Sequence, residues 1–224
     1  MASVIITGTN RGTGAGIAEV LREAGYHVVG WDRTVAAGSD TVKCDVRDPD
    51  QVGRAAAQLP PDLGAVVANA GIRRFGAVDD LPLTDWRDSV DTNLSGVYYL
   101  ARATLPLLRA NRGVFIVIGS HAEKYPFEGG AAYCATKLAL RGLVDCLIAD
   151  ARHDGVRATY LSLGAIKNRD HGQDEQWKLT PRHVGQVVLA VLRLPEPILV
   201  PYLDARPLCP PQDGAGGIGR LQTV

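Results

Sequence analysis

Tyr133 is the only one of the seven tyrosines with a lysine four residues downstream, Lys137, and the surrounding residues favour a helix. Side chains four positions apart share one face of a helix. A free phenol has a pKa near 10, so only about one part in a thousand is ionised at neutral pH. An ammonium about 4 Å away is worth up to roughly 4 kcal/mol at an effective dielectric constant of 20, or about three pK units. The spacing predicts a tunable acid/base, although a surface aromatic beside a solvated lysine shows the same pattern.

A glycine-rich segment, Thr7-Gly-Thr-Asn-Arg-Gly-Thr-Gly14, follows a short apolar run. Glycines between a strand and a helix let the backbone approach a pyrophosphate, and amides at the helix start can bind it. Asp32 follows the next apolar run, 18 residues beyond Gly14. That is close to the offset at which a carboxylate receives the ribose hydroxyls of a dinucleotide. The pattern predicts a dinucleotide site.

The same residues bear on the choice between NAD and NADP. A carboxylate at Asp32 repels a 2′-phosphate, which favours NAD. Arg11 and Arg33 leave NADP open, because either guanidinium could attract that phosphate. Asp32 carries more weight, since a flexible arginine only partly offsets the repulsion between a phosphate and a carboxylate.

Apolar runs alternate with helix-like segments along residues 3–200. Continuous apolar strands separated by helices are typical of a parallel sheet covered on both faces. We therefore predict an α/β fold with a doubly wound, parallel, seven-stranded sheet and helices on both faces. The expected strands are residues 3–7, 27–31, 41–44, 64–68, 114–118, 156–163 and 198–200. The expected helices end at Gly25 or span 49–59, 86–111, 131–153 and 181–194, the last with a Thr180 cap.

No linker divides this pattern, so residues 1–206 are expected to form one dinucleotide-binding and catalytic domain. From Pro207 the composition shifts to proline, glycine and polar residues, which predicts an irregular tail over 207–224. The tail contains a literal G-x-G-x-x-G match, Gly214-Ala-Gly-Gly-Ile-Gly219. It follows two prolines and opens no helix, so we reject it as a phosphate site.

Composition excludes several classes of function. The 24 Lys and Arg residues balance 24 Asp and Glu residues, so no charge excess favours nucleic acid as a partner. No segment approaches the roughly 18 apolar residues of a membrane span, and no signal region starts the chain, so a cytoplasmic protein with no membrane partner is expected. The four cysteines form no C-x-x-C pair and are expected to be reduced packing residues.

The chain resembles the short-chain dehydrogenase/reductase superfamily. The motifs that carry the resemblance span about residues 3 to 200 in the expected order. It implies a Rossmann fold and an NAD(P)-dependent oxidoreductase that interconverts a secondary alcohol and a ketone by hydride transfer. The matching motifs are Thr7-Gly-x-x-x-Gly-x-Gly14, Asp45-Val46, Asn69-Ala-Gly71, Asn93 in Asp-Thr-Asn-Leu-Ser-Gly, Ser120, and Tyr133-x-x-x-Lys137.

The resemblance also implies a role for each catalytic candidate. Tyr133 would be the general acid/base, and Lys137 would lower its pKa and bind the nicotinamide ribose. Ser120 would hydrogen-bond the substrate oxygen. Asn93 would hold a water that links Lys137 to solvent.

Cofactor contacts are implied along the whole cleft, and no metal site is expected. Asp45 and Val46 would lie at the adenine, and Asn69-Ala-Gly71 would line the cleft and brace the sheet. The implied cofactor-binding residues are Gly8, Asn10, Arg11, Gly12, Thr13, Gly14, Asp32, Arg33, Asp45, Val46, Asn69, Ala70, Gly71, Tyr133, Lys137, Gly164 and Ile166.

Two departures affect the substrate side. Leu163-Gly164 stands where the family usually has Pro-Gly, and Asn168 falls near the threonine that binds the carboxamide. The segment 165–179 is short and polar for a substrate lid. It favours a hydroxylated or anionic small-molecule substrate, although each of its residues could be a solvated loop residue. Other polar candidates near the substrate are Arg73, Arg74, His121, Glu123, Lys124, Tyr125 and Glu128.

Other functions remain open at this point. The alternatives are an NADP-dependent ketoreductase and a non-catalytic cofactor-binding regulator of the same fold. A nucleotide-sugar epimerase or dehydratase is less favoured, because only about 60 residues follow the sixth strand. A homodimer or homotetramer through the long helices is also expected, with apolar positions shared between core and partner at Leu140, Leu143, Val144 and Leu147.

Overall fold

The computed structural model describes residues 2–35, 40–167 and 176–209. These residues include one seven-stranded sheet in the order β3-β2-β1-β4-β5-β6-β7, with every adjacent pair parallel. The predicted α/β Rossmann-like fold is confirmed. The strands are β1 (Ser3–Thr7), β2 (His27–Asp32), β3 (Thr41–Lys43), β4 (Leu63–Ala68), β5 (Val114–Ile118), β6 (Arg157–Leu163) and β7 (Tyr202–Ala205).

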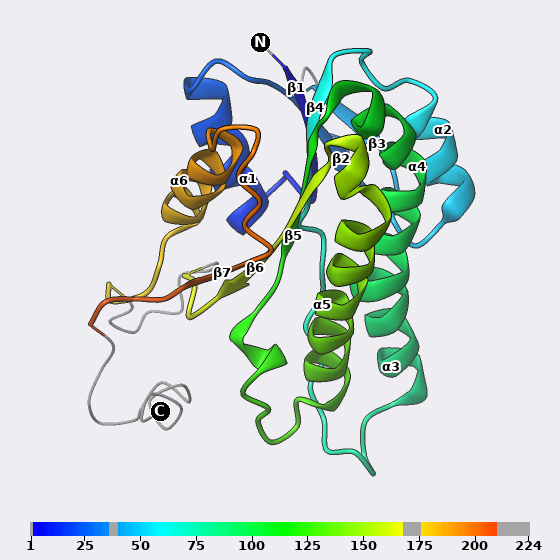
Figure 1. Ribbon diagram of the computed structural model, residues 1–224. Helices are drawn as coiled ribbons and strands as arrows, with labels where there is room; N and C mark the ends of the chain where they lie inside the picture. The colour runs from blue at the N-terminus through cyan, green and yellow to red at the C-terminus, as the bar shows by residue number, and fades with distance from the viewer. Residues whose placement is uncertain (1, 36–39, 168–175, 210–224) are drawn as a thin grey trace.

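Helices cover both faces of the sheet (Figure 1). On one face α1 (Gly12–Glu23) packs against α6 (Pro181–Leu192). Thr180 begins α6 as predicted, because its hydroxyl accepts a hydrogen bond from the His183 N–H at 3.1 Å. The other face is covered by α2 (Pro49–Ala56), α3 (Leu83–Val90), α4 (Gly96–Asn111) and α5 (Ala131–Ala151).

Alternate residues of the central strands build two hydrophobic cores. On β5, Phe115 and Val117 pack toward α4 and α5, whereas Val114 and Ile116 pack toward α1 and α6. All four are buried. Because both faces of the sheet are covered, such a strand is a continuous apolar run, which is why its bounds can be predicted from sequence.

The order of the strands reverses between β1 and β4. From β1 the chain moves outward to β2 and β3, then returns to β4 and continues in the other direction. Open parallel sheets bind ligands outside the carboxyl ends of the strands at such a point. The segments leaving β1 and β4 here are Gly8–Gly14 and Asn69–Gly71, both predicted to contact a cofactor.

The helix predicted from about Trp86 to Asn111 is interrupted. α3 begins earlier, at Leu83, and a π-helical turn, Asp91–Ser95, separates it from α4. Such turns insert an extra residue into a helix and are frequent at functional sites. Asn93 lies in this turn and is buried.

The last strand lies later than the predicted residues 198–200. Pro201 has no N–H, so it cannot continue a ladder on both sides. Its carbonyl accepts a hydrogen bond from the Tyr160 N–H at 2.9 Å, and pairing with β6 begins at Tyr202. The Ile198 N–H instead closes a turn on the Pro195 carbonyl at 2.9 Å.

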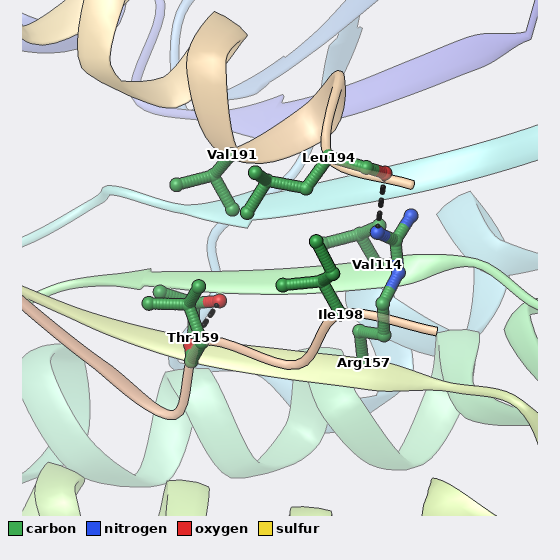
Figure 2. Close-up of a pocket in the computed structure, with 7 residues that line it drawn as sticks. Val114, Arg157, Thr159, Val191, Leu194 and Ile198 are labelled. Carbon is green, nitrogen blue, oxygen red and sulfur yellow. Dashed lines mark hydrogen bonds between the residues drawn. The ribbon is translucent and has the colours of Figure 1, made fainter. Parts of the chain in front are cut away.

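A small hollow lies beneath the connection from α6 to β7 (Figure 2). Arg157 donates to the Leu194 carbonyl and the Thr159 hydroxyl to the Val200 carbonyl, each at 2.8 Å. Val114 and Arg157 begin their strands, so the hollow is at the opposite end of the sheet from the ligand-binding edge. It is a small gap in the packing between the sheet and the segment that joins α6 to β7. Its lining residues are Val114, Arg157, Thr159, Val191, Leu194, Ile198 and Val200.

Within the part of the chain described, no helix is long and apolar enough to cross a membrane. All four cysteines are free. Cys44 is buried as a packing residue should be, whereas Cys146 and Cys209 are exposed and do not serve the core. The glycine pattern in the tail lies outside the described residues.

The α5 positions expected to be shared with a partner copy pack mainly into the chain's own core. Leu140 and Val144 are each 1% exposed, and Leu147 is also buried. Leu143 is partly buried against the same core. Leu138, by contrast, is 55% exposed.

Candidate active site

The loop between β1 and α1 has the shape that a phosphate-binding turn requires. Gly8 and Gly12 have φ values of +76° and +58°, a region that other residues rarely adopt. A Cβ on Gly14 would lie 2.0 Å from the Gly8 carbonyl oxygen and 2.5 Å from Asn69 Nδ2, so no side chain fits there. Arg11 precedes the helix and provides no side-chain cap for the first amides of α1.

Asn69 and Thr7 fasten this loop to the end of β4. The Thr7 hydroxyl accepts hydrogen bonds from the Asn69 N–H at 3.0 Å and the Ala70 N–H at 2.9 Å. The Asn69 side-chain amide donates to the carbonyls of Thr7 at 2.9 Å and Gly8 at 3.1 Å. These bonds give Asn69 the bracing contacts that the sequence predicts.

Asp32, at the end of β2, is oriented by the glycine loop. Its Oδ2 accepts hydrogen bonds from the Thr9 N–H at 2.6 Å and the Thr9 hydroxyl at 2.7 Å. The Asn10 side-chain amide donates to the Thr34 carbonyl at 2.7 Å and to its hydroxyl at 2.9 Å. One oxygen of Asp32 is thus fixed by the loop that its charge helps to shape.

Asp45 and Val46 follow β3. The Asp45 carboxylate accepts hydrogen bonds from the Arg47 side chain, among them one of 3.0 Å from Nε and one of 2.7 Å from Nη2. These hydrogen bonds, assisted by the charge of Arg33, lower the pKa of the Asp45 carboxyl. Val46 is buried against Gly96, where a Cβ would lie 2.9 Å from its Cγ2. Val46 therefore contributes an apolar contact between the end of β3 and the start of α4.

These segments fit a dinucleotide. The glycine loop leaves a space that a side chain at Gly14 would fill. The first amides of α1 have no capping side chain. Both features suit a bound pyrophosphate. Asp32 offers an oriented carboxylate suited to ribose hydroxyls. Thr13 is buried in the first turn of α1. Among the described residues, no group of three His, Cys, Asp or Glu side chains is placed to hold a metal ion.

Ser120 and Tyr133 meet at the carboxyl end of β5. Ser120 lies two residues beyond the strand and caps the 3-10 turn His121–Glu123, its hydroxyl accepting from the Ala122 N–H at 3.2 Å. Tyr133 lies in the first turn of α5, and its phenol is near enough to the Ser120 side chain for Ser120 to favour a lower pKa of that phenol. The two hydroxyls predicted to act on one substrate oxygen are therefore together.

The pKa of Tyr133 is raised, contrary to the lowering predicted from Lys137. Burial is the largest cause, because it disfavours the phenolate, while the hydrogen bond with Ser120 and the charge of Arg73 act in the other direction. Lys137 Nζ lies 5.8 Å from the centroid of the Tyr133 ring. The Lys137 ammonium donates a hydrogen bond to the Ile118 carbonyl at 2.8 Å, so it is held at the end of β5.

Lys137 and Asn93 lie beside each other behind Tyr133. Burial lowers the pKa of Lys137 to about 8. Asn93 Oδ1 accepts from the Ile72 N–H at 2.8 Å, and its Nδ2 donates to the Ile72 carbonyl at 3.0 Å. A Cβ on Gly71 would lie 3.3 Å from Asn93 Oδ1 and 4.0 Å from Lys137 Nζ, so the three residues adjoin. The water relay through Asn93 stays a prediction.

This arrangement can be compared with known proteins. A family model described as short chain dehydrogenase matches residues 2–178. The chain belongs to the short-chain dehydrogenase/reductase family. Its members are NAD(P)-dependent oxidoreductases that act on CH–OH groups, so the identification from sequence motifs is confirmed, and NAD(P) is the cofactor class.

Individual relatives of this short-chain dehydrogenase cover nearly the whole chain. The sepiapterin reductase of Chlorobaculum tepidum is 30% identical over 90% of this chain and 88% of that protein. The NADP-dependent 3-hydroxy acid dehydrogenase of Salmonella typhi is 30% identical over 92% and 94%. The crystal structure of serine dehydrogenase from Escherichia coli has a TM-score of 0.83 and 28% identity, covering 92% of this chain and 98% of that one.

In this chain, Tyr160 links two catalytic candidates, Ser120 and Lys137, and the sequence analysis did not identify it. Its hydroxyl accepts from the Ser120 N–H at 3.2 Å and donates to the Lys137 carbonyl at 3.0 Å. Its ring stacks on Tyr202, with centroids 5.7 Å apart. A Cβ on Gly119 would lie 2.2 Å from Tyr160 Cζ, so a glycine leaves room for the ring. No local pattern connects residues so distant in sequence.

Tyr160→Phe is expected to lower kcat about tenfold, because two hydrogen bonds of roughly 0.5–1.5 kcal/mol each are lost while the ring remains. The KM for the cofactor should not change. Steady-state kinetics measure both quantities. Tyr202→Phe is the matched control, since it keeps the stacked rings and the Ser120–Lys137 link. An equal loss in the two variants would assign the effect to ring packing instead.

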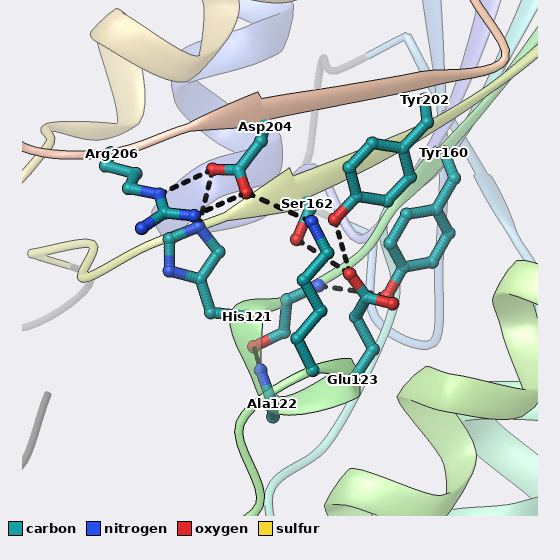
Figure 3. A network of polar contacts seen from close by, with 10 residues as sticks. His121, Ala122, Glu123, Tyr160, Ser162, Tyr202, Asp204 and Arg206 are labelled. Atoms are coloured by element: carbon teal, nitrogen blue, oxygen red, sulfur yellow. Dashed lines mark hydrogen bonds and ion pairs between the residues drawn. The ribbon is translucent and has the colours of Figure 1, made fainter. Parts of the chain in front are cut away.

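The loop after Ser120, predicted to contact substrate, is bound largely to β7 (Figure 3). His121 Nε2 lies 2.8 Å from Asp204 Oδ1, and Lys124 Nζ lies 3.4 Å from Asp204 Oδ2. Arg206 adds two bonds of 2.9 Å to the same carboxylate. Burial alone raises the pKa of Asp204, but hydrogen bonds with Arg206 and His121 outweigh it and hold that pKa well below its usual range.

Glu123 in the same loop faces the interior. Its buried carboxylate accepts hydrogen bonds from the Ser162 hydroxyl at 3.2 Å and from the Tyr202 hydroxyl. Its other oxygen lies 3.6 Å from Arg141 Nη1. Three of the expected substrate contacts, His121, Glu123 and Lys124, therefore dock the loop on the sheet, whereas Tyr125 and Glu128 stay at least partly exposed.

Gly164 and Ile166 lie just after β6. The Gly164 N–H donates to the carbonyl of the last β7 residue at 2.9 Å, and a Cβ on Gly164 would lie 3.0 Å from His121 Cε1. Ile166 is half-buried. The cofactor contacts expected of both stay predictions. Asn168 and the rest of the range 168–175 lie outside the described residues.

Proposed function

We propose that the chain interconverts secondary alcohols and ketones, with Tyr133 as the general acid/base. The observation that carries the proposal is the grouping of Ser120, Tyr133 and Lys137 at the carboxyl end of β5, where the Ser120 side chain acts on the Tyr133 phenol and the buried Lys137 Nζ lies 5.8 Å from the centroid of the Tyr133 ring. Bound NAD(P) supplies the hydride acceptor for oxidation and the hydride donor for reduction.

The residues divide the remaining work between them. In the oxidation, the carbinol carbon loses a hydride, its hydroxyl loses a proton to ionised Tyr133, and a ketone remains. In the reduction, protonated Tyr133 returns that proton to the ketone oxygen. The Ser120 hydroxyl donates a hydrogen bond to the same oxygen as negative charge develops on it. Lys137, with a pKa of about 8, exchanges protons near neutral pH, which suits a relay behind Tyr133.

The experiment is a panel of secondary alcohols, polyols, hydroxy acids and cyclic ketones, followed by NAD(P)H absorbance. Because the pKa of Tyr133 is raised, the phenol holds its proton at neutral pH. Reduction should therefore proceed at neutral pH, and oxidation should increase toward alkaline pH. Cofactor binding without turnover of any panel member would favour the non-catalytic regulator.

We further propose that NAD(H) is preferred over NADP(H), unlike in the NADP-dependent relative of Salmonella typhi. Asp32 supports this choice, because its carboxylate is held in place by Thr9 at the end of β2. Of the two arginines that favour NADP, Arg33 has a charge that contributes to the lowered pKa of Asp45. Arg11 is exposed at the start of α1.

Asp32→Asn is expected to raise the ratio of kcat/KM for NADP to kcat/KM for NAD at least about tenfold, because like charges about 4 Å apart repel by up to roughly 4 kcal/mol. The amide oxygen can still accept the Thr9 hydrogen bonds. Titrations of both cofactors on both proteins measure the ratio. A parent that already prefers NADP, or an unchanged ratio, would reject the NAD assignment and favour the NADP-dependent ketoreductase.

We also propose that copies associate into a homo-oligomer through α4 and α5. Tyr98 on α4 is 49% exposed and Leu138 on α5 is 55% exposed, so apolar surface remains on both helices. Light scattering measures the assembly directly, and a monomer at working concentration would reject the proposal.

A further inference from the structure

Two adjacent arginines beside the site have different surroundings. Arg74 forms an ion pair with Asp85 at 3.4 Å and approaches Asp88 at 4.0 Å. Arg73 is exposed and has no ion-pair partner among the residues that the structure describes. An unpaired guanidinium presents a planar set of donors that matches a carboxylate. Arg73 is therefore available to an external anion, whereas Arg74 is occupied.

The loop that carries Arg73 is fastened on both sides. Before it, both backbone groups of Ile72 are bonded to the Asn93 side chain, at 2.8 and 3.0 Å. After it, the Phe75 ring meets the Tyr133 ring edge to face, with centroids 6.0 Å apart. The Gly76 N–H then donates to the carbonyl of Gly129, just before α5, at 2.9 Å. Arg73 is thus held between two anchors that both lie at the candidate active site.

The charge of Arg73 also affects the Tyr133 phenol. It partly offsets the rise in pKa that burial causes. Phe75, two residues after Arg73, contacts the Tyr133 ring at 6.0 Å between centroids. An anion that pairs with Arg73 would therefore lie on the Tyr133 side of the site.

The neighbouring surface is apolar. Phe75 and Phe127 form an edge-to-face pair with centroids 5.4 Å apart, and their side chains are 55% and 42% exposed. Exposed aromatic rings beside an unpaired cation suit a small molecule that has a carboxylate and a carbon skeleton. The charged loop after Ser120 does not compete for this role, because its His121 and Lys124 side chains contact Asp204.

We propose that Arg73 binds the carboxylate of a hydroxy acid or oxo acid whose reacting oxygen contacts Tyr133. The carboxylate then lies one or two carbons from the reacting carbon, and Phe75 and Phe127 contact the rest of the molecule. This inference rests on the proposed alcohol–ketone chemistry and names its substrate class. Arg73 acts as the residue that discriminates acids from neutral alcohols.

The test uses matched pairs, each a 2- or 3-hydroxy acid and its methyl ester, with the parent, Arg73→Gln, Arg73→Lys and the control Arg74→Gln. The parent should prefer the acid. Arg73→Gln should lower kcat/KM for the acid about 10- to 100-fold, mainly through KM, as expected when a hydrogen-bonded charge pair of roughly 1.5–3 kcal/mol is lost. The ester should be affected much less. Arg73→Lys should recover part of the loss, and Arg74→Gln should behave as the parent.

The outcomes separate this inference from the function on which it rests. A parent that uses esters as well as acids, or an Arg73→Gln variant that loses both equally, would overturn the role of Arg73 and leave the alcohol–ketone chemistry intact. Failure of the parent to turn over either member of any pair, while other secondary alcohols react, would overturn the hydroxy acid assignment alone. No reaction with any secondary alcohol or ketone would reject the proposed function itself.

Discussion

Tyr133→Phe is expected to lower kcat by about 10²- to 10⁴-fold, the usual contribution of a positioned acid/base. The substitution removes only the hydroxyl, which holds the transferred proton and interacts with the Ser120 side chain. The ring keeps its contact with Phe75, at 6.0 Å between centroids. The fold and the cofactor cradle around Gly8–Gly14 should therefore be unchanged.

The rate of NAD(P)H formation or consumption measures kcat in both proteins. A fluorescence titration with the reduced cofactor is the control, and its dissociation constant should be the same for parent and variant. Loss of activity together with loss of cofactor binding would point to damage of the cleft. A variant as active as the parent would show that another group moves the proton.

Lys137→Met should have opposite effects on activity and stability. The ammonium is expected to bind the nicotinamide ribose and to serve the relay, so kcat should fall about 10²-fold or more, the loss typical of removing a charged donor from a preorganised site. Methionine fills a similar volume without charge. The buried position of Lys137, at 7% exposure, means that its charge is costly to the folded state.

The pKa of Lys137 sets the size and the pH window of the stability effect. Burial lowers it from 10.5 to about 8. Each pK unit corresponds to about 1.4 kcal/mol, so the buried charge costs roughly 3 kcal/mol below about pH 8, partly offset by the bond to the Ile118 carbonyl. Between about pH 8 and 10.5 the unfolded chain holds this proton and the folded chain does not, so the parent gains stability as pH rises.

Urea unfolding at about pH 7 and about pH 10 measures this effect. Lys137→Met should be more stable than the parent by about 1–2 kcal/mol at the lower pH, and the difference should shrink at the higher pH. A variant that is less stable at neutral pH would show that the hydrogen bond to Ile118 outweighs the cost of burial.

Local signals were sufficient for the elements that position the site. Strand β5 could be predicted with its observed bounds, Val114–Ile118, because a strand covered on both faces is a continuous apolar run. The glycine loop could be predicted because a turn between strand and helix restricts side chains, as the 2.0 Å clash at Gly14 shows. The common helix face of Tyr133 and Lys137 follows from their spacing.

Features that depend on distant contacts could not be predicted in this way. Tyr160 reaches Ser120 only because Gly119, directly after β5, lacks a side chain. The sign of the Tyr133 pKa shift depends on burial and on where the Lys137 ammonium points, and spacing reports neither. The start of β7 depends on how Pro201 meets β6.

For the charged residues near the site, the sequence indicates which are candidates, but their pairing depends on distant contacts. The sequence identifies Arg73 and Arg74 as equivalent candidates, and only the structure pairs Arg74 with Asp85. His121 and Lys124 look equally able to contact a substrate, yet both contact Asp204 on β7. Whether a charge is free or paired depends on the fold and not on its position in a loop.

Deuterium transfer from a secondary alcohol labelled on its carbinol carbon tests the central claim most directly. The parent should pass the label to the oxidised cofactor, and mass spectrometry of the reduced cofactor should show one deuterium per turnover. Tyr133→Phe should bind the cofactor but transfer the label at least about 10²-fold more slowly. Reduced cofactor without the label, or transfer by Tyr133→Phe at the parental rate, would contradict the account.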